Sequence, residues 1–237
     1  MTTGDLHARR ARDVLLVALT VATGAVDAVS WLAFDKVFSA FMTGNIVLLG
    51  FGVAGAAGPP VLRSAASLAG FGTGAALAGR IISPDPSEET WPRRVTTALA
   101  LVVLVEAAFL AVWIVVDASP SSATATALIT ISALAMGTQT IAVFSLGVRA
   151  VFTTAATATW AALTGDLSHW ARSRKERRRL ALVVAALFAG AVAGGLLIDN
   201  APLWAPVLPL TLTAGVVILA ALRFGDELAP RAQPAER

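Results

Sequence analysis

The stretch that decides the fold is Val14-Leu-Leu-Val-Ala-Leu-Thr20-Val-Ala-Thr-Gly24-Ala-Val-Asp27-Ala-Val-Ser-Trp31-Leu-Ala-Phe34, which contains a single charged residue. Its length is that of a helix that crosses a lipid bilayer, about 20 residues. A carboxylate inside such a helix costs roughly 3 kcal/mol on insertion scales, and it normally faces a polar interior or a partner. Asp27 therefore indicates that this helix borders something polar.

Five other segments share this length and apolar character. The chain of 237 residues is 57% hydrophobic and only 14% charged, whereas an ordinary soluble domain has about 25% charged residues. We therefore expect an all-α polytopic membrane protein of about six transmembrane helices, whose main partner is the lipid bilayer. The six predicted spans are Val14–Phe34, Val61–Ile82, Val95–Val116, Ala123–Gly147, Leu180–Ile198 and Leu203–Leu222.

Two weaker segments lie between these spans, and each is expected either to cross the membrane or to dip into it and return. Ser39–Gly58 is rich in glycine, and Val151–Ala171 is rich in threonine and also holds Asp166 and His169. They occupy matching places in two related halves, about 14–116 and 123–223, so the sequence predicts an internal repeat. The matched pairs are Val37-Phe-Ser with Val151-Phe-Thr, Gly24 with Gly137, Trp31 with Phe144, Thr43 with Thr157, and Gly70-x-x-x-Gly74 with Gly190-x-x-x-Gly194.

The basic residues distinguish between six and eight spans. If the N-terminus is cytoplasmic and both weak segments are re-entrant, only Lys36 and Arg63 of the 18 basic residues lie outside. If both weak segments cross the membrane, more basic residues lie outside, including Arg93 and Arg94. Because basic loops favour the cytoplasmic side, six spans are preferred. The second half is then inverted relative to the first, which is a recurrent arrangement in transporters.

The ends of the chain are polar. Residues 1–13 are predicted to form a cytoplasmic N-terminal tail, residues 14–223 a single membrane domain, and residues 224–237 a disordered cytoplasmic tail. The chain has no cysteine, which excludes disulfides, a thiolate nucleophile and a cysteine metal site. Basic cytoplasmic loops account for the net charge of +3, so we expect no nucleic-acid partner, no metal and no cofactor.

Two carboxylates are the leading functional candidates. Asp27 shares one helix face with Thr20, Gly24 and Trp31, and this small, polar face is expected to pack inward. Glu106 lies at the middle of the third predicted span. Each acid is expected to bind a cation, relay a proton or accept a hydrogen bond from a solute. The alternative is a neutral acid in a helix–helix contact.

Uncharged polar residues mark the rest of the predicted path. Thr43 and Asn45 are expected to cap the start of the first weak segment, where Gly44 permits an unusual backbone. A helix N-terminus at membrane depth offers free N–H groups to an anionic or polar solute. The other residues predicted to line the path are Gln139, Thr157 and Thr159. Adhesion between helices is the alternative role for Gln139.

Several of these motifs resemble those of the YoaK-like family of bacterial inner-membrane proteins, a domain of unknown function. The motifs are Asp27-Ala-Val-Ser-Trp-Leu, Val37-Phe, Met42-Thr-Gly-Asn-Ile-Val-Leu-Leu-Gly50, Met136-Gly-x-Gln139 and the threonine-rich stretch Thr153–Thr164. The resemblance covers nearly the whole chain and implies a multi-span protein of the bacterial inner membrane. The chain departs from the family pattern at Thr140, where asparagine is usual, and at Ala158, where glycine is usual.

Together these features predict a transporter or channel-like protein for a small polar solute or ion, coupled to protons through its buried carboxylates. A homo-oligomer is compatible with the many small residues. The alternative is a membrane scaffold or assembly subunit without transport. An enzyme is disfavoured, and no catalytic residue is assigned, because cysteine and tyrosine are absent and no histidine-rich or paired-aspartate motif occurs.

Overall fold

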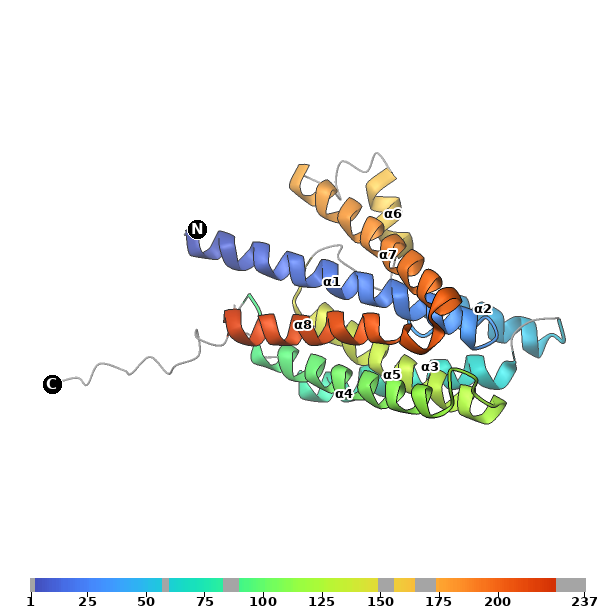
Figure 1. The fold of residues 1–237 in the computed structure, drawn as a ribbon. Coiled ribbons are helices and arrows are strands. Elements are labelled where there is room, and N and C mark those ends of the chain that lie inside the picture. The colour runs from blue at the N-terminus through green and yellow to red at the C-terminus, as the bar shows by residue number, and fades with distance from the viewer. Residues whose placement is uncertain (1–2, 57–59, 83–89, 149–155, 165–173, 225–237) are drawn as a thin grey trace.

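The computed structural model describes residues 3–56, 60–82, 90–148, 156–164 and 174–224, and these residues are almost entirely helical (Figure 1). The six long apolar segments predicted from the sequence are all helices, and both weak segments contain a short helix. The helices are α1 (Thr3–Ala33), α2 (Met42–Val53), α3 (Val61–Ile81), α4 (Arg93–Val115), α5 (Ser122–Ser145), α6 (Ala156–Thr164), α7 (Arg174–Asn200) and α8 (Val207–Phe224), with a 3₁₀ turn η1 (Pro202–Trp204) before α8.

Five of the described helices are long and apolar enough to cross a membrane, namely α1, α4, α5, α7 and α8 together with η1. Helix α3 is of similar length, but its many glycine, alanine and serine residues and two arginines make it less hydrophobic. Helix α1 begins at Thr3, so most of the predicted N-terminal tail continues the first span as helix. The predicted C-terminal tail lies outside the described residues, apart from Phe224, which ends α8.

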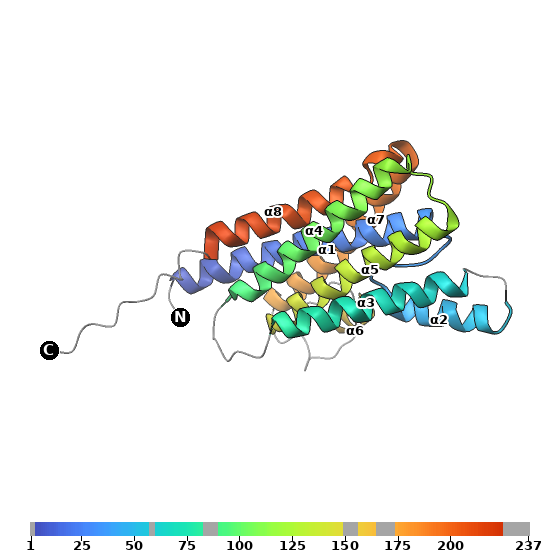
Figure 2. The ribbon, with the colours of Figure 1, turned by 90° about the horizontal axis from the view of Figure 1, so that it is seen from below.

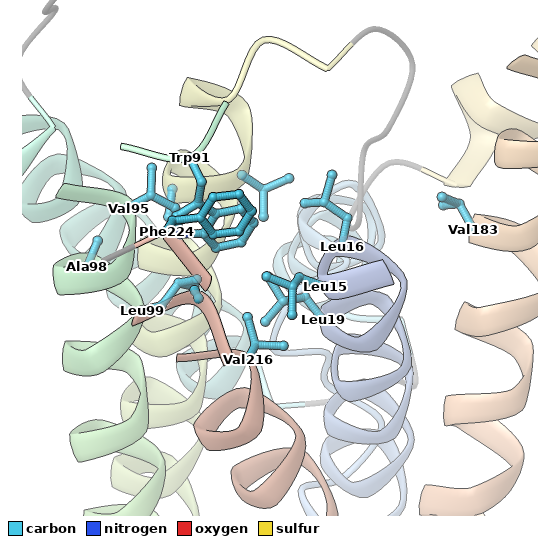
Figure 3. Close-up of a cluster of buried hydrophobic side chains, with 13 residues drawn as sticks. Leu15, Leu16, Leu19, Trp91, Val95, Ala98, Leu99, Val183, Val216 and Phe224 are labelled. Carbon is cyan, nitrogen blue, oxygen red and sulfur yellow. The ribbon is translucent and has the colours of Figure 1, made fainter. Parts of the chain in front are cut away.

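The six long helices run side by side between two hydrophobic clusters at opposite ends of the bundle. Figure 3 shows the first cluster, which we call the Trp91 end. There the rings of Trp91 and Phe224 stack with centroids 5.8 Å apart, beside Leu16 and Leu19 of α1. The ends of α3 and α5 and the start of α4 also meet at this cluster, so long helices that follow each other in the chain are antiparallel, whereas the packed pairs α3–α5 and α1–α7 are parallel.

The second cluster, the Trp113 end, joins the other ends of α1, α4, α5 and α7. Phe34 packs edge-on against Phe109 and Trp113, at centroid distances of 6.0 and 5.9 Å. The start of α5 and the end of α7 complete this cluster. The indole N–H of Trp113 donates to the carbonyl oxygen of Pro202, 2.9 Å away, and thereby fixes the turn between α7 and α8.

The chain folds back on itself after α1. Phe34 and Val37 belong to the Trp113 end, whereas Ala40 packs halfway along the bundle with Val26 and Met136. The segment between α1 and α2 thus runs back alongside α1, and α2 then leads out again toward the Trp113 end (Figure 2). Helix α2 packs beside α3, and α6 packs beside α7.

Close glycine contacts hold the bundle together in two pairs, α3 with α5 and α1 with α7. A Cβ atom added to Gly74 of α3 would overlap the carbonyl oxygen of Leu134 in α5. A Cβ atom added to Gly190 of α7 would overlap the carbonyl oxygen of Val21 in α1. Small residues that let helix backbones touch are a main source of association between membrane helices.

Gly74 and Gly72 offer a matched test of this packing. We expect Gly74→Ala to destabilise the folded protein by about 1–3 kcal/mol, because the new methyl group meets backbone that cannot move aside. Gly72→Ala on the same helix is expected to be neutral or stabilising, because a Cβ atom there meets no other atom within 4 Å. Both effects on stability are measured by heating each variant in detergent and determining the fraction that remains folded by size-exclusion chromatography. Equal losses in the two variants would contradict the packing.

Candidate functional site

Asp27 holds the folded-back segment against α1. Its Oδ1 atom accepts the backbone N–H groups of Ser39, at 2.9 Å, and of Ala40, at 2.7 Å. These N–H groups lie just before α2 and have no helical partner of their own, so in the interior of a bilayer they need an acceptor. The carboxylate of Asp27 thus occupies the place that the sequence assigned to an anionic solute at the start of the weak segment.

Asn45 completes this connection from the side of α2. Its side chain accepts the N–H of Phe38 at 3.0 Å and donates to the carbonyl oxygen of the same residue at 2.7 Å. The hydroxyl of Ser67 on α3 donates to the same carbonyl oxygen at 2.6 Å. Asn45 and Ser67 are both fully buried. We use the name latch for Asp27, Asn45, Ser67 and the backbone of residues 38–40 that they bind.

Three serine hydroxyls continue the polar network inward. Ser39, in the folded-back segment, lies 2.6 Å from the hydroxyl of Ser30 on α1. Ser39 also donates to the hydroxyl of Ser132 on α5, at 2.7 Å. These contacts connect α1, the folded-back segment and α5 at the middle of the bundle, and we call them the serine chain.

Glu106 lies next to the serine chain in a small interior cavity. The cavity measures about 20 Å³ and is bounded by α1, α4, α5 and the start of α8. Ser30, Ser132 and Glu106 supply its polar groups, and the rest of the lining is apolar, including Phe109 and Met136. Oε1 of Glu106 accepts a long hydrogen bond of 3.4 Å from Thr213, whereas Oε2 is buried without a protein partner.

Gln139 lies at a different place and joins α5 to α1. Its Nε2 atom donates to the hydroxyl of Thr23 at 2.9 Å, and the side chain is fully buried. This is the interhelical hydrogen bond that the sequence offered as the alternative role of Gln139. Gln139 does not line the Glu106 cavity.

The predicted capping roles of Thr43 and Asn45 are wrong, and the backbone at Gly44 is not unusual. Phe41 is the N-cap residue of α2, no side chain caps the helix, and Asn45 instead binds the backbone of Phe38. Gly44 lies in regular helix, where its lack of a side chain makes room for the ring of Phe41. Thr43 is exposed and faces an outer groove lined by the aromatic rings of Trp31, Phe38 and Phe41.

The second weak segment is described only in part. Thr159 is fully buried in α6. Thr157 also lies in α6, but its side chain is outside what the structure describes, as are Asp166 and His169. Within the described ranges, no three His, Cys, Asp or Glu side chains lie close enough together to hold a metal ion.

Arg63 pairs with Asp35, and with neither of the two candidate acids. Its guanidinium forms an ion pair with the Asp35 carboxylate and also donates to the hydroxyl of Ser122 at 3.2 Å. This contact ties the ends of α1, α3 and α5 together at the Trp113 end. The arginine is buried while the aspartate is mostly exposed, so the pair lies at the boundary of the bundle.

Sequence reasoning missed the serines that join the two parts of the site. Ser30 lies three residues after Asp27 and therefore on the same helix face, which is a signal that the sequence contains. Ser39, Ser67 and Ser132 come from three other parts of the chain, and their meeting depends on the fold. The structure thus brings Asp27 and Asn45 together in the latch and connects them to Glu106 only through the serine chain.

These features define an α-helical, multi-pass membrane protein with a buried polar network. The profile of the family described as "Protein of unknown function (DUF1275)" matches residues 15–219. The chain is also 31% identical over 224 residues to UPF0700 transmembrane protein YoaK of Bacillus subtilis (strain 168), covering 91% of this chain and 97% of that protein. The chain therefore belongs to the DUF1275 family, which confirms the resemblance inferred from its motifs. No solved structure matches it.

The latch predicts graded effects of substitution at Asp27. Asp27→Ala leaves the N–H groups of Ser39 and Ala40 without an acceptor and should cost about 2–4 kcal/mol of stability. Asp27→Asn keeps an acceptor oxygen, so its loss should be smaller. Thermal unfolding in detergent measures both, with the exposed Thr43→Ala as a control that should match the wild type. An Asp27→Ala protein as stable as this control would refute the latch.

Proposed function

We propose that this protein transports a small polar solute or ion across the bacterial inner membrane, with movement coupled to protons at its buried carboxylates. The observation that carries the proposal is Glu106, an acid 8% exposed, with one oxygen unpartnered, in a cavity at the middle of the bundle. Such a group is expensive inside a membrane protein, and it typically marks a substrate or proton pathway.

The proposed topology has six crossings, with α3 as the sixth span. The segment from Phe34 to Val53 enters from the Trp113 end, reaches the depth of Asp27 and returns to the same end. Asp27 lies six residues before the end of α1, which corresponds to a depth of about 9 Å. Arg9, Arg10, Arg93, Arg94 and Arg223 then gather at the Trp91 end, which the positive-inside rule places in the cytoplasm.

Two related, inverted halves are supported by the way in which the glycine contacts repeat. Gly24 of α1 faces Leu187 and Ala191 of α7, while Gly137 of α5 faces Phe71 and Ala75 of α3. The first long helix of each half thus packs against the second long helix of the other half.

The same contacts revise the alignment of the two halves by one helical turn. Gly74 faces Leu134 and Gly190 faces Val21. Gly74 therefore corresponds to Gly190, whereas the sequence motifs alone matched Gly70 with Gly190. With this register, equivalent glycines meet equivalent backbone positions in both helix pairs.

The halves differ in polarity, and the polar groups gather in the first. Asp27 corresponds to Thr140, whose hydroxyl donates to the carbonyl oxygen of Met136 in its own helix. Asn45 corresponds to Thr159 by the motif alignment. We infer that the first half supplies the re-entrant element that takes part in transport and that the second half supplies a less polar counterpart.

A scaffold without transport is the alternative. The small-residue faces that favoured an oligomeric scaffold are largely used inside the bundle, since Gly74 faces α5 and Gly190 faces α1. A scaffold also has no need for an unpartnered acid beside an interior cavity. We therefore favour transport over this alternative.

Proteoliposomes containing a trapped pH-sensitive dye test the proposal. A panel of amino acids, carboxylates, sugars and alkali cations is added outside, and the internal pH is recorded. We expect at least one solute to change the internal pH with wild-type protein, and Glu106→Gln and Asp27→Asn to slow this change at least tenfold while remaining folded. Gly72→Ala, which contacts neither site, is the matched control.

If no member of the panel changes the internal pH, and the protein purifies with a stoichiometric partner, the scaffold replaces the transporter. Normal solute-evoked fluxes in well-folded Glu106→Gln and Asp27→Asn proteins would remove the two acids from the mechanism.

A further inference from the structure

We propose that the outer groove beside α2 binds an acyl chain of a phospholipid whose anionic headgroup is held by Lys36. The walls of the groove come from the end of α1, the folded-back segment and α2, and they include Trp31, Phe38, Phe41, Val47 and Leu48. The groove shares no residue with the Glu106 cavity, so this lipid site stands or falls independently of transport.

The groove has the size and the lining of a site for a hydrocarbon chain. Its volume is about 280 Å³, close to the lower end of the range of about 300–1,000 Å³ that is typical of small-molecule sites. The accessible surface of its walls is entirely apolar. A polar solute therefore finds no hydrogen-bond partner on these walls, whereas a hydrocarbon chain needs none.

The latch and a set of aromatic contacts hold the groove in shape. Asn45 binds both the N–H and the carbonyl oxygen of Phe38. The ring of Phe38 stacks on that of Trp31, with centroids 4.6 Å apart, and meets the ring of Phe41 edge-on at 5.2 Å. Because the walls are already fixed by these contacts, a chain binds without the cost of ordering them.

Exposed apolar side chains of α2 extend the groove along the helix. Helix α2 packs beside α3 (Figure 2), and its opposite side carries exposed Ile46, Phe51 and Val53. We call the groove together with these three side chains the α2 face. An apolar surface of this kind marks a contact with a partner or with lipid.

Lys36 lies at the boundary of the bundle, next to the groove. Phe34 and Val37, on either side of it in the chain, belong to the Trp113 end. Its ammonium nitrogen lies 5.6 Å from the centre of the Trp31 ring, which is also a wall of the groove. Lysine and tryptophan together are typical of the level of the lipid headgroups.

The positive charge of Lys36 is available to a ligand. The side chain is exposed, and the carboxylate of the neighbouring Asp35 is bound by Arg63. Within the described ranges, no acid forms an ion pair with Lys36. Basic residues beside a membrane attract anionic lipids, and an ammonium group donates strong hydrogen bonds to phosphate oxygens. The charge therefore selects an anionic phospholipid among the molecules that carry acyl chains.

A second copy of the chain fits the α2 face less well. In a two-fold symmetric contact, the copy presents the same surface patch to its partner. The residues of the α2 face include no acid that could pair with Lys36. A phospholipid supplies both an apolar chain and a negative charge, so it complements the groove and the lysine together.

Native mass spectrometry in detergent tests the headgroup. The protein is mixed with phosphatidylglycerol or phosphatidylcholine, each with one palmitoyl and one oleoyl chain. We expect Lys36→Gln to retain about one phosphatidylglycerol fewer per chain than wild type, and Lys36→Arg, which keeps the charge, to retain the wild-type number. Phosphatidylcholine should be retained equally by all three proteins. An unchanged number of bound phosphatidylglycerol molecules in folded Lys36→Gln would overturn the proposal.

Filling the groove tests the position of the chain. Val47→Trp places a large ring at a half-exposed position of the groove and should remove the same phosphatidylglycerol that Lys36→Gln loses. The double variant should therefore lose no more lipid than either single variant. Leu104→Trp adds the same ring at an exposed position of α4, outside the groove, and should retain the wild-type number. Equal retention by folded Val47→Trp and Leu104→Trp proteins would remove the chain from the groove.

The mass of the protein in the same spectra distinguishes lipid from a second copy. The proposal expects Val47→Trp to leave the number of chains per particle unchanged. A wild-type dimer that Val47→Trp converts to a monomer would assign the α2 face to a second copy and overturn the lipid site.

Discussion

The interior of a membrane protein cannot leave backbone N–H groups without an acceptor, and this constraint shapes the region between α1 and α2. The chain leaves helical geometry at Phe34 and does not resume it until Met42, yet Ser39 and Ala40 lie halfway along the bundle. Asp27 supplies the acceptor for these two residues, and Asn45 supplies both an acceptor and a donor for Phe38. The first reason for a charged residue in α1 is therefore structural: Asp27 accepts the hydrogen bonds of backbone N–H groups that have no helical partner.

The glycine contacts explain why the polar centre is held at a fixed geometry. The pairs α1–α7 and α3–α5 are joined backbone to backbone, so each half of the chain is bound to a helix of the other half. The Glu106 cavity lies between α1, α4, α5 and the start of α8, where residues of both halves meet.

The sequence was sufficient to locate the helices, but it predicted the hydrogen-bond partners of their polar side chains poorly. Apolar length located all six long helices, because an uninterrupted apolar run as long as Val95–Val116 is typical of a helix that crosses a bilayer. Gln139 was assigned a helix-to-helix hydrogen bond as one of two possible roles, and the structure contains that bond with Thr23. The caps assigned to Thr43 and Asn45 failed, because Asn45 bonds backwards to Phe38, a local geometry that residue type alone does not specify.

The serine chain could not be predicted from the sequence, for a different reason. Ser39 and Ser132 are separated by 93 residues, and serine is common in membrane helices as a simple packing residue. In the proposed repeat, the alignment of the halves also differs by one turn from that of the motifs, because alanine and glycine recur so often along α3 and α7 that spacing alone allows several registers. Only the contact of Gly74 with Leu134, beside that of Gly190 with Val21, selects one of them.

The most direct test of the account concerns the proposed re-entrant segment, and it uses single cysteines in a chain that naturally has none. Cysteines at Lys36, before α2, and at Ala56, after it, are exposed to an impermeant thiol reagent on intact cells, with His7→Cys as the internal reference. The account predicts that Lys36→Cys and Ala56→Cys are both labelled from outside, while His7→Cys reacts only after permeabilisation. Labelling of Lys36→Cys with protection of Ala56→Cys would show that α2 crosses the membrane, and it would contradict the proposed re-entrant segment and the proposed inverted halves together.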